Sequence, residues 1–356
     1  MWASTQVARG ITKVIWRFPM RHQLVALFFI FFASAGSLIA TVAVGQVSST
    51  TETAYMPPRT SEGQPDLQGI WSNAVLTPLE RPAQFADQSF LTEEEAIAYE
   101  AQRNDETFRG TRDLDAATDV AYAYNDFWWD QGSTIASTRR TSLVIDPLDG
   151  RIPPLTAEGE KRRNARNEYR RLHPADGPEN RLLRERCIVW SGGGDLGAGP
   201  PMLPSAYNNN FQLVQTADHI LILKEMIHET RVIPLDGRPH LPGSVRQWLG
   251  NSRGHWEGDT LVVETANFTH KTHFQSTSEH MRLTERFTRL ADDMLMYEFM
   301  VEDPVMLTRS WTAQIPTMKL DGLIYEYACH EANRGMVGLL GGARAEERAA
   351  REAANE

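Results

Sequence analysis

Acidic residues are missing from the start of this chain. No Asp or Glu occurs before Glu52, and four basic residues precede the uncharged apolar stretch Leu24 to Val44: Arg9, Lys13, Arg17 and Arg21. A basic start, an apolar core and a small-residue end, here Ala43-Val44-Gly45, are typical of a secretory signal. The sequence therefore predicts export, with residues 1–45 removed by cleavage after Gly45.

The same apolar stretch is also long enough to span a bilayer, since about 20 apolar residues suffice. An uncleaved membrane anchor is therefore the alternative, and its basic flank would stay cytoplasmic. In both cases the bulk of the chain is periplasmic or secreted. Contact with a membrane is expected only through this N-terminal segment.

Positive charge is scarce in the rest of the chain. Removal of residues 1–45 takes away four basic residues and no acidic one, which changes the formal net charge from −10 to −14. So acidic a chain argues against nucleic acid or an anionic membrane surface as the main partner. The composition does not determine the oligomeric state.

Cysteine is nearly absent, with Cys187 and Cys329 as the only two. In an oxidising compartment an even pair is a candidate disulfide. Closing so long a loop would contribute about 4–5 kcal/mol in the chain-entropy model. Two buried thiols are the alternative, because sequence alone cannot place two Cα atoms within bridging distance.

Motifs for cofactors and for nucleophilic catalysis are also missing. Gly192, Gly194 and Gly197 form a G-x-G-x-x-G, but three prolines soon after them exclude the helix that a dinucleotide site needs. There is no nucleophile elbow and no phosphate-binding P-loop. His270 and His273 form an H-x-x-H without the Glu of a zinc protease. We therefore expect no organic cofactor and no metal.

The chain divides into a linker over 46–64, a folded domain over 65–342 and a helical tail over 343–356. Thr92 to Glu95 form a capping box that predicts a helix, and a second helix is expected from Thr156. That second helix carries a basic cluster: Lys161, Arg162, Arg163, Arg166, Arg170 and Arg171. In an acidic chain, a solvated helix face is the favoured interpretation over a polyanion site.

Short strands with turn signals dominate from Tyr207 onward. The ranges expected as strands are 211–215, 220–223, 225–233, 255–256, 260–264, 281–290, 294–301, 307–315 and 323–329. The loop at 291–293 sets a register that places Phe287 opposite Tyr297 and an Arg286–Glu298 ion pair beside them. Successive antiparallel strands without intervening helices predict a mainly β fold. The expected architecture is an antiparallel barrel or sandwich with helical insertions and a C-terminal helix.

Gly69-Ile70-Trp71 resembles the G-x-W opening of lipocalins, in which a first-strand Trp closes one end of the barrel. This resemblance implies a lipocalin-like barrel. Three further stretches, at 140–147, 233–240 and 253–260, are similar to a family of uncharacterised exported bacterial proteins. That second resemblance implies export and a single folding unit, and it implies no activity.

His228, Glu229 and Arg231 form the densest polar cluster within strand-like sequence. Alternate side chains of a strand share a face, so Glu229 and Arg231 lie together and His228 lies opposite them. Facing a cavity, His228 could transfer a proton near neutral pH, or Glu229 and Arg231 could orient a polar substrate group. The alternative is an exterior Glu229–Arg231 ion pair beside a surface histidine.

Other candidate residues lie near expected turns and strand ends. Tyr207 and His240 complete the catalytic candidates. The candidate ligand contacts are Asn208, Asn209, Asn210, Arg253, Trp256 and Tyr297. A run of asparagines favours turns through side-chain bonds to the backbone, and a polar rim at a barrel mouth is the alternative. Trp256 fits either the core or the wall of a ligand cavity.

Three functions agree with these observations. The first is a cofactor-free acid–base enzyme (a lyase, isomerase or hydrolase) that acts on a small apolar or aromatic molecule. The second is a periplasmic binding or carrier protein that uses the same cavity without turnover. The third is a structural, envelope-associated protein whose interior is filled.

Overall fold

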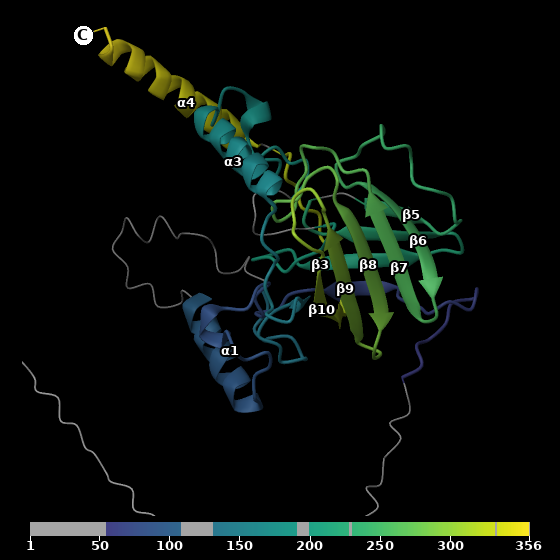
Figure 1. Cartoon of the computed structure of the whole chain (residues 1–356). Helices are drawn as coiled ribbons and strands as arrows, with labels where there is room; N and C mark the ends of the chain where they lie inside the picture. The colour runs from purple at the N-terminus through teal and green to yellow at the C-terminus, as the bar shows by residue number, and fades with distance from the viewer. Residues whose placement is uncertain (1–54, 108–130, 191–198, 228–229, 332, 356) are drawn as a thin grey trace, which may run out of the picture. The chain divides into compact units, whose positions relative to one another are not determined.

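The computed structural model describes residues 55–107, 131–190, 199–227, 230–331 and 333–355. These residues belong to one compact unit, which spans Ala54–Glu356 (Figure 1). The predicted signal and the first part of the predicted linker lie outside the described residues. Among the residues described, no helix combines the length and the apolar character needed to cross a membrane.

A ten-stranded antiparallel sheet forms the centre of the fold (Figure 1). Along the sheet the strand order is β5-β4-β3-β1-β10-β9-β8-β7-β6, with the short β2 paired to β10. The strands are β1 (Gly69–Ser72), β2 (Val144–Asp146), β3 (Asn210–Gln215), β4 (His219–Lys224), β5 (Thr230–Pro234), β6 (Asn251–Glu257), β7 (Thr260–Ala266), β8 (Arg282–Arg289), β9 (Met294–Glu302) and β10 (Trp311–Leu320). The prediction of a mainly antiparallel β fold is therefore confirmed.

The sheet is open between β5 and β6, because no backbone ladder joins these two strands. The two edges nevertheless touch. A Cβ added at Gly254 of β6 would lie 2.7 Å from Leu235 Cδ2 and 3.0 Å from Ile233 Cγ2. Arg231 of β5 donates from Nη2 to Ser252 Oγ of β6 at 3.2 Å. Side chains rather than backbone hydrogen bonds therefore join the two edges, so closure into a barrel by hydrogen bonding is not what the structure shows.

Strand alternation builds the core on the inner face of the sheet. In β8 every second side chain is buried from Leu283 onward, and in β9 the buried side chains begin at Leu295. The indole of Trp71 is fully buried and donates from Nε1 to Leu67 O at 3.0 Å. The largest fully buried side chains beside it are Trp311, Tyr297, Phe211, Phe268, Phe287 and Phe299. Most of the inner face is therefore filled by apolar side chains.

The predicted register of the β8–β9 hairpin is confirmed, since Phe287 faces Tyr297 and Arg286 faces Glu298. The predicted Arg286–Glu298 ion pair is wrong. Arg286 donates from Nη2 to Glu257 Oε2 at 2.7 Å, and Glu298 instead accepts a bond from Gln314 Nε2 at 2.7 Å. The reason is that both side chains find partners outside the hairpin, Glu257 at the end of β6 and Gln314 on β10, which the hairpin register alone does not reveal.

Three α-helices and two short 3-10 helices accompany the sheet within the described residues: α1 (Glu93–Thr107), α3 (Ala157–Leu172), α4 (Arg334–Ala353), η1 (Ala83–Phe85) and η3 (Pro178–Asn180). The capping box before α1 forms as predicted, since Thr92 N donates to Glu95 Oε2 and Glu95 N donates to Thr92 Oγ1. Thr156 caps α3 by accepting from Gly159 N at 2.9 Å.

The C-terminal part departs from the prediction. The strand expected at 323–329 is absent. Residues 321–331 and 333, which we call the C-terminal strap, run without regular structure. Helix α4 then begins at Arg334 rather than at Ala343. Arg344 of α4 donates to Ala175 O and Asp176 O, in the loop that follows α3 (Figure 1). Apolar periodicity alone did not distinguish the strap from a strand.

Candidate functional site

The two ends of the sheet differ in their connections. At one end, tight turns join β3 to β4, β6 to β7, and β8 to β9. At the other end lie the longer connections, which include 225–229, 267–281 and 303–310 and the long segment between β1 and β3. We call this second end the loop-bearing end. Binding sites in such folds favour the end that carries the longer loops, because loops vary without disturbing the core.

A buried polar cluster lies on the inner face of the sheet. Arg231 donates to both carboxylate oxygens of Glu285, at 3.0 Å from Nη1 and 2.6 Å from Nη2. Its Nη2 also lies within hydrogen-bond distance of Ser252 Oγ and Thr265 Oγ1. Tyr297 donates from its hydroxyl to Glu285 Oε1 at 2.8 Å. The cluster therefore links β5 to β6, β7, β8 and β9, across the gap between the two sheet edges.

Burial governs the charges in this cluster. The Glu285 side chain is 0% exposed and that of Arg231 is 8% exposed, so each needs the other as a countercharge. Burial and the negative charge of Glu285 raise the pKa of Tyr297 well above its ordinary value. The phenol therefore stays protonated, and its oxygen accepts a bond from Met202 N at 3.0 Å.

A small pocket adjoins this cluster at the loop-bearing end. Its lining includes Trp190, Met202, Lys224, Met226, Ile227 and Arg231. Its cavity volume of about 20 Å³ is room for roughly one water molecule. The two cationic residues of this lining, Lys224 and Arg231, are each less than a tenth exposed. Lys224 donates from Nζ to Asn73 Oδ1 at 3.2 Å and to Asn209 O at 3.0 Å. Two buried cationic side chains therefore line an otherwise apolar pocket.

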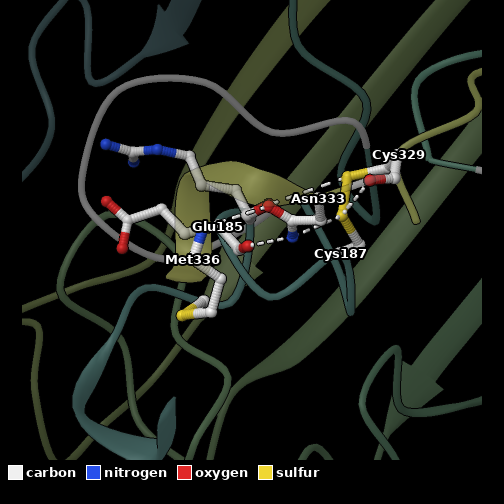
Figure 2. Close-up of a disulfide and its surroundings, with 6 residues drawn as sticks. Glu185, Cys187, Cys329, Asn333 and Met336 are labelled. Carbon is white, nitrogen blue, oxygen red and sulfur yellow. Dashed lines mark hydrogen bonds between the residues drawn. A yellow bond between two sulfur atoms is a disulfide. The ribbon is translucent and has the colours of Figure 1, made fainter. Parts of the chain in front are cut away.

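A disulfide between Cys187 and Cys329 joins this region to the C-terminal strap (Figure 2). The sequence left open a disulfide or two buried thiols, and the structure shows the disulfide. The bond is compatible with export. Asn333 donates from Nδ2 to Glu185 O at 2.9 Å and accepts from Met336 N, so it joins the start of α4 to the same region (Figure 2). The strap is therefore attached beside the pocket by one covalent bond and one polar residue.

The strap also packs against the residues that line the pocket. Tyr327 of the strap, together with Trp190, Tyr207 and Cys329, packs against Met226 and Ile227. Tyr325 N of the strap donates to Glu225 Oε1 at 3.2 Å. The strap consequently packs against Met226 and Ile227, two residues of the pocket lining.

The predicted residues Tyr207 and Asn208 to Asn210 lie near this pocket. Tyr207 contacts Trp190 ring to ring at 6.2 Å. Asn208 adopts a positive φ of 54°. Asn209 is fully buried and bonds to both the N–H and the C=O of Ser205, and Asn210 donates to Glu225 Oε2. Of the two interpretations of the asparagine run, a turn held by side-chain bonds to the backbone or a polar rim, the first describes Asn209.

The structure does not bring His240 and Arg253 to Arg231. His240 Nδ1 lies 3.3 Å from Asn251 Oδ1, and Arg253 donates from Nε to Pro239 O. The side chain of Ser252 faces the buried cluster, so its neighbours Asn251 and Arg253 point to the opposite, outer face of β6. His240 contacts Asn251 and therefore lies on that outer side as well. Trp256 lies on the inner side and packs against the core.

The other predicted residues have different outcomes. His228 and Glu229 lie outside the described residues. Arg231 is buried on the inner face rather than exposed on the exterior. Tyr297 is fully buried and contacts Glu285.

Sequence reasoning missed Glu285 and Lys224. Glu285 alternates with Leu283 and Phe287, both of which are buried. That alternation predicts a carboxylate inside the core, which requires a countercharge. Lys224 is likewise in register with Ile220 and Ile222 on the inner face of β4. The signal that would have identified both residues is a charged residue at an inward position of a strand.

A larger and more polar hollow of about 760 Å³ also lies at the loop-bearing end. Its lining includes Arg246, His280, Arg282, Glu302 and Asp303. Asp303 is buried, and Ser278, Val305 and Met306 donate to its carboxylate. Among the described residues, no group of three His, Cys, Asp or Glu side chains is placed to hold a metal ion.

Comparisons of this chain with protein-family models, with curated proteins and with solved structures return no match.

Proposed function

We propose that this protein is an exported small-molecule-binding protein whose ligand binds at the loop-bearing end of a barrel-like sheet. The observation that carries this proposal is the pocket beside Glu285, in which Lys224 and Arg231 line otherwise apolar walls. Apolar lining with a few placed polar groups is the usual composition of small-molecule sites. The disulfide supports export, because such bonds persist in oxidising compartments.

The barrel-like character of the sheet is part of the proposal. Strands β1 and β10, the first and the last along the chain, pair with each other. Strands β5 and β6 meet through Arg231, Ser252 and Gly254. These two contacts support the proposal that the sheet curls around its core, with one seam that lacks backbone bonds. The G-x-W resemblance to lipocalins agrees with this arrangement.

The chemistry of the pocket suggests the chemistry of the ligand. Trp190, Met226 and Ile227 favour an apolar or aromatic body. Lys224 and Arg231 favour an acceptor end such as a carboxylate or a carbonyl oxygen. A ligand of several atoms exceeds the present volume, so binding requires the loops and the strap at this end to move outward.

Binding without turnover is favoured over acid–base catalysis. Arg231 and Tyr297 both donate to Glu285, and the raised pKa of Tyr297 makes its phenol a weak acid. The proton transfer expected from the sequence would depend on His228 and Glu229. The described residues therefore support a carrier more directly than an enzyme.

The test is native mass spectrometry of the protein purified from the periplasm of its own host. A co-purifying molecule with an apolar body and an acceptor group is the expected result. Lys224→Met should weaken rebinding of that molecule by about tenfold, which corresponds to the loss of one charge-assisted hydrogen bond. Trp190→Ala tests the apolar wall independently, in case Lys224→Met lowers stability.

The matched control is Lys271→Met, which removes the same charge from an exposed site on the 267–281 connection. It should leave rebinding unchanged. Protein that emerges without any bound molecule, and that shows no binding to a library of aromatic carboxylates, would contradict the proposal and favour a structural role.

A further inference from the structure

Helix α3 carries two rows of arginines with different surroundings. Arg162 pairs with Glu158 at 2.8 Å, and Arg171 pairs with Glu168 at 2.7 Å, in each case within the helix. Arg163, Arg166 and Arg170 follow the spacing i, i+3, i+7, so they share a different face. All three are partly buried, whereas Arg162 and Arg171 are exposed. We call Arg163, Arg166 and Arg170 the inner arginine row.

The inner arginine row is turned toward the body of the protein. Gly159 lies on the same face, and a Cβ added there would meet Met306 O. Farther along α3, Arg170 Nη2 lies 3.3 Å from His273 Nε2, on the connection between β7 and β8. The row therefore lies between the helix and a loop of the loop-bearing end.

No carboxylate among the residues that the structure describes forms an ion pair with this row. Ion pairs among the described residues involve Arg162 and Arg171 of this helix but none of the inner row. The pKa of Arg166 is lowered by burial and by the positive charges of Arg170 and Arg163. Three guanidinium groups of like charge are thus held together at the surface of a chain whose formal net charge is −10.

His273 completes the cluster as a neutral acceptor. Burial, followed by the charges of Arg166 and Arg170, lowers the pKa of His273 to about 3. Its imidazole is therefore uncharged at neutral pH, and Nε2 can accept from Arg170. The positive charges of Arg166 and Arg170 thus keep the imidazole uncharged, and within the described part of the chain the two guanidinium groups have no carboxylate partner.

Hydrogen-bond donors in this cluster are also unused. Arg166 Nε is buried and has no hydrogen-bond partner among the described residues. The hydroxyl of Thr272, the neighbour of His273 in the chain, is buried and equally unpartnered. Buried donors are seldom left without an acceptor, and such exceptions often mark an absent ion or water.

We propose that the inner arginine row, beside the neutral imidazole of His273, binds the oxyanion of a phosphate or sulfate group. The planar guanidinium fork matches such an oxyanion with two parallel hydrogen bonds. An anion would balance the clustered charges and give Arg166 Nε an acceptor. The site is separate from the pocket beside Glu285, and its existence does not depend on the function proposed for that pocket.

The test is isothermal titration calorimetry of the full exported chain with inorganic phosphate at constant ionic strength, with chloride as the reference anion. The double variant R166Q/R170Q should weaken phosphate binding by about tenfold for each guanidinium removed. The matched control is R162Q/R171Q, which removes the same charge from the outer side of the same helix. This control should bind phosphate within about twofold of the parent chain.

A second readout is independent of affinity. Bound phosphate adds negative charge beside His273, so the imidazole pKa should rise on addition of phosphate, as followed by NMR of the ring protons. Phenyl phosphate separates two sources of the anion. Tighter binding than inorganic phosphate indicates a phosphorylated organic ligand, and equal binding indicates the free ion. The proposal is overturned if phosphate binds no better than chloride, or if the two double variants lose binding equally.

Discussion

Glu285 is a carboxylate at a position where strand alternation calls for an apolar side chain. It lies between Leu283 and Phe287 on the inner face, and it is fully buried. Arg231 and Tyr297 meet its two oxygens, so the charge is compensated by a bidentate ion pair and a hydroxyl. Such a pair is costly to break, because removal of one partner leaves the other charged and buried.

We predict that Glu285→Gln lowers the free energy of unfolding by about 3–5 kcal/mol, because Arg231 then lacks its countercharge. Urea denaturation measures this loss. The matched control is Glu257→Gln, which breaks the Arg286–Glu257 pair where the side chains are 36% and 50% exposed. This control substitution should lower the free energy of unfolding by less than about 1 kcal/mol. Equal losses in the two variants would show that the buried pair contributes no more than a surface pair.

His273 is predicted to make stability depend on pH. Its pKa is about 3 in the folded chain, against an ordinary value of 6.5. The unfolded chain therefore takes up this proton first, and stability should fall as the pH drops from about 6.5 toward 3. His273→Gln should reduce that slope when unfolding free energies are measured in phosphate-free buffer.

Protonation of carboxylates also contributes to the slope, so the comparison between variants isolates the imidazole. His280→Gln, at a side chain that is 47% exposed on the same connection, serves as the control. The attribution of this slope to His273 is contradicted if His273→Gln and His280→Gln change the pH dependence of the unfolding free energy to the same extent.

At the scale of elements, the seam between β5 and β6 distinguishes this sheet from a closed barrel. The connection 235–250 returns the chain from the tight-turn end to the start of β6, and no ladder forms between the two strands. Close packing takes the place of the ladder. Gly254 allows Ile233 and Leu235 to approach the backbone of β6, and Arg231 crosses to Ser252.

Gly254→Ala is predicted to destabilise the protein by about 1 kcal/mol, because its Cβ would press against Leu235 and Ile233 and overpacking has a cost of this order. Thermal unfolding followed by circular dichroism measures it. The control is Gly322→Ala in the C-terminal strap, where an added Cβ meets nothing within 4 Å. An unchanged midpoint in Gly254→Ala would mean that the two edges do not press together in solution.

At the scale of the whole molecule, the disulfide connects parts of the chain that are 142 residues apart. It joins the segment before β3 to the strap, which packs against Met226 and Ile227 of the pocket lining. The bond therefore contributes to the stability of the fold and holds the strap against these two residues.

Replacement of both cysteines, C187S/C329S, is predicted to lower the free energy of unfolding by about 5 kcal/mol, the chain-entropy value for a loop of this length. Urea denaturation under non-reducing conditions measures the loss. The parent chain treated with a thiol reductant should show the same loss. The variant should also be cleaved faster by protease within residues 321–333. A variant as stable as the parent chain would contradict this account.

Local patterns predicted much of the fold. The capping box at Thr92, the start of α3 at Thr156, the β8–β9 register and most of the strands depend on neighbours in the chain, so the sequence carries their signal directly. Contacts between residues that are far apart in the chain were less predictable. The partner of Arg286, the strap in place of a last strand, and the outer placement of His240 each depend on which surfaces the folded chain brings together.

From the sequence alone follow the antiparallel β character, the N-terminal apolar stretch and the acidity of the remaining chain, because composition and short-range periodicity determine each of them. Only the tertiary structure decided that Arg231 meets Glu285, that Cys187 meets Cys329, and that Arg170 of α3 lies beside His273. Those contacts join residues far apart in the chain, and burial, which no linear pattern records, sets their energies.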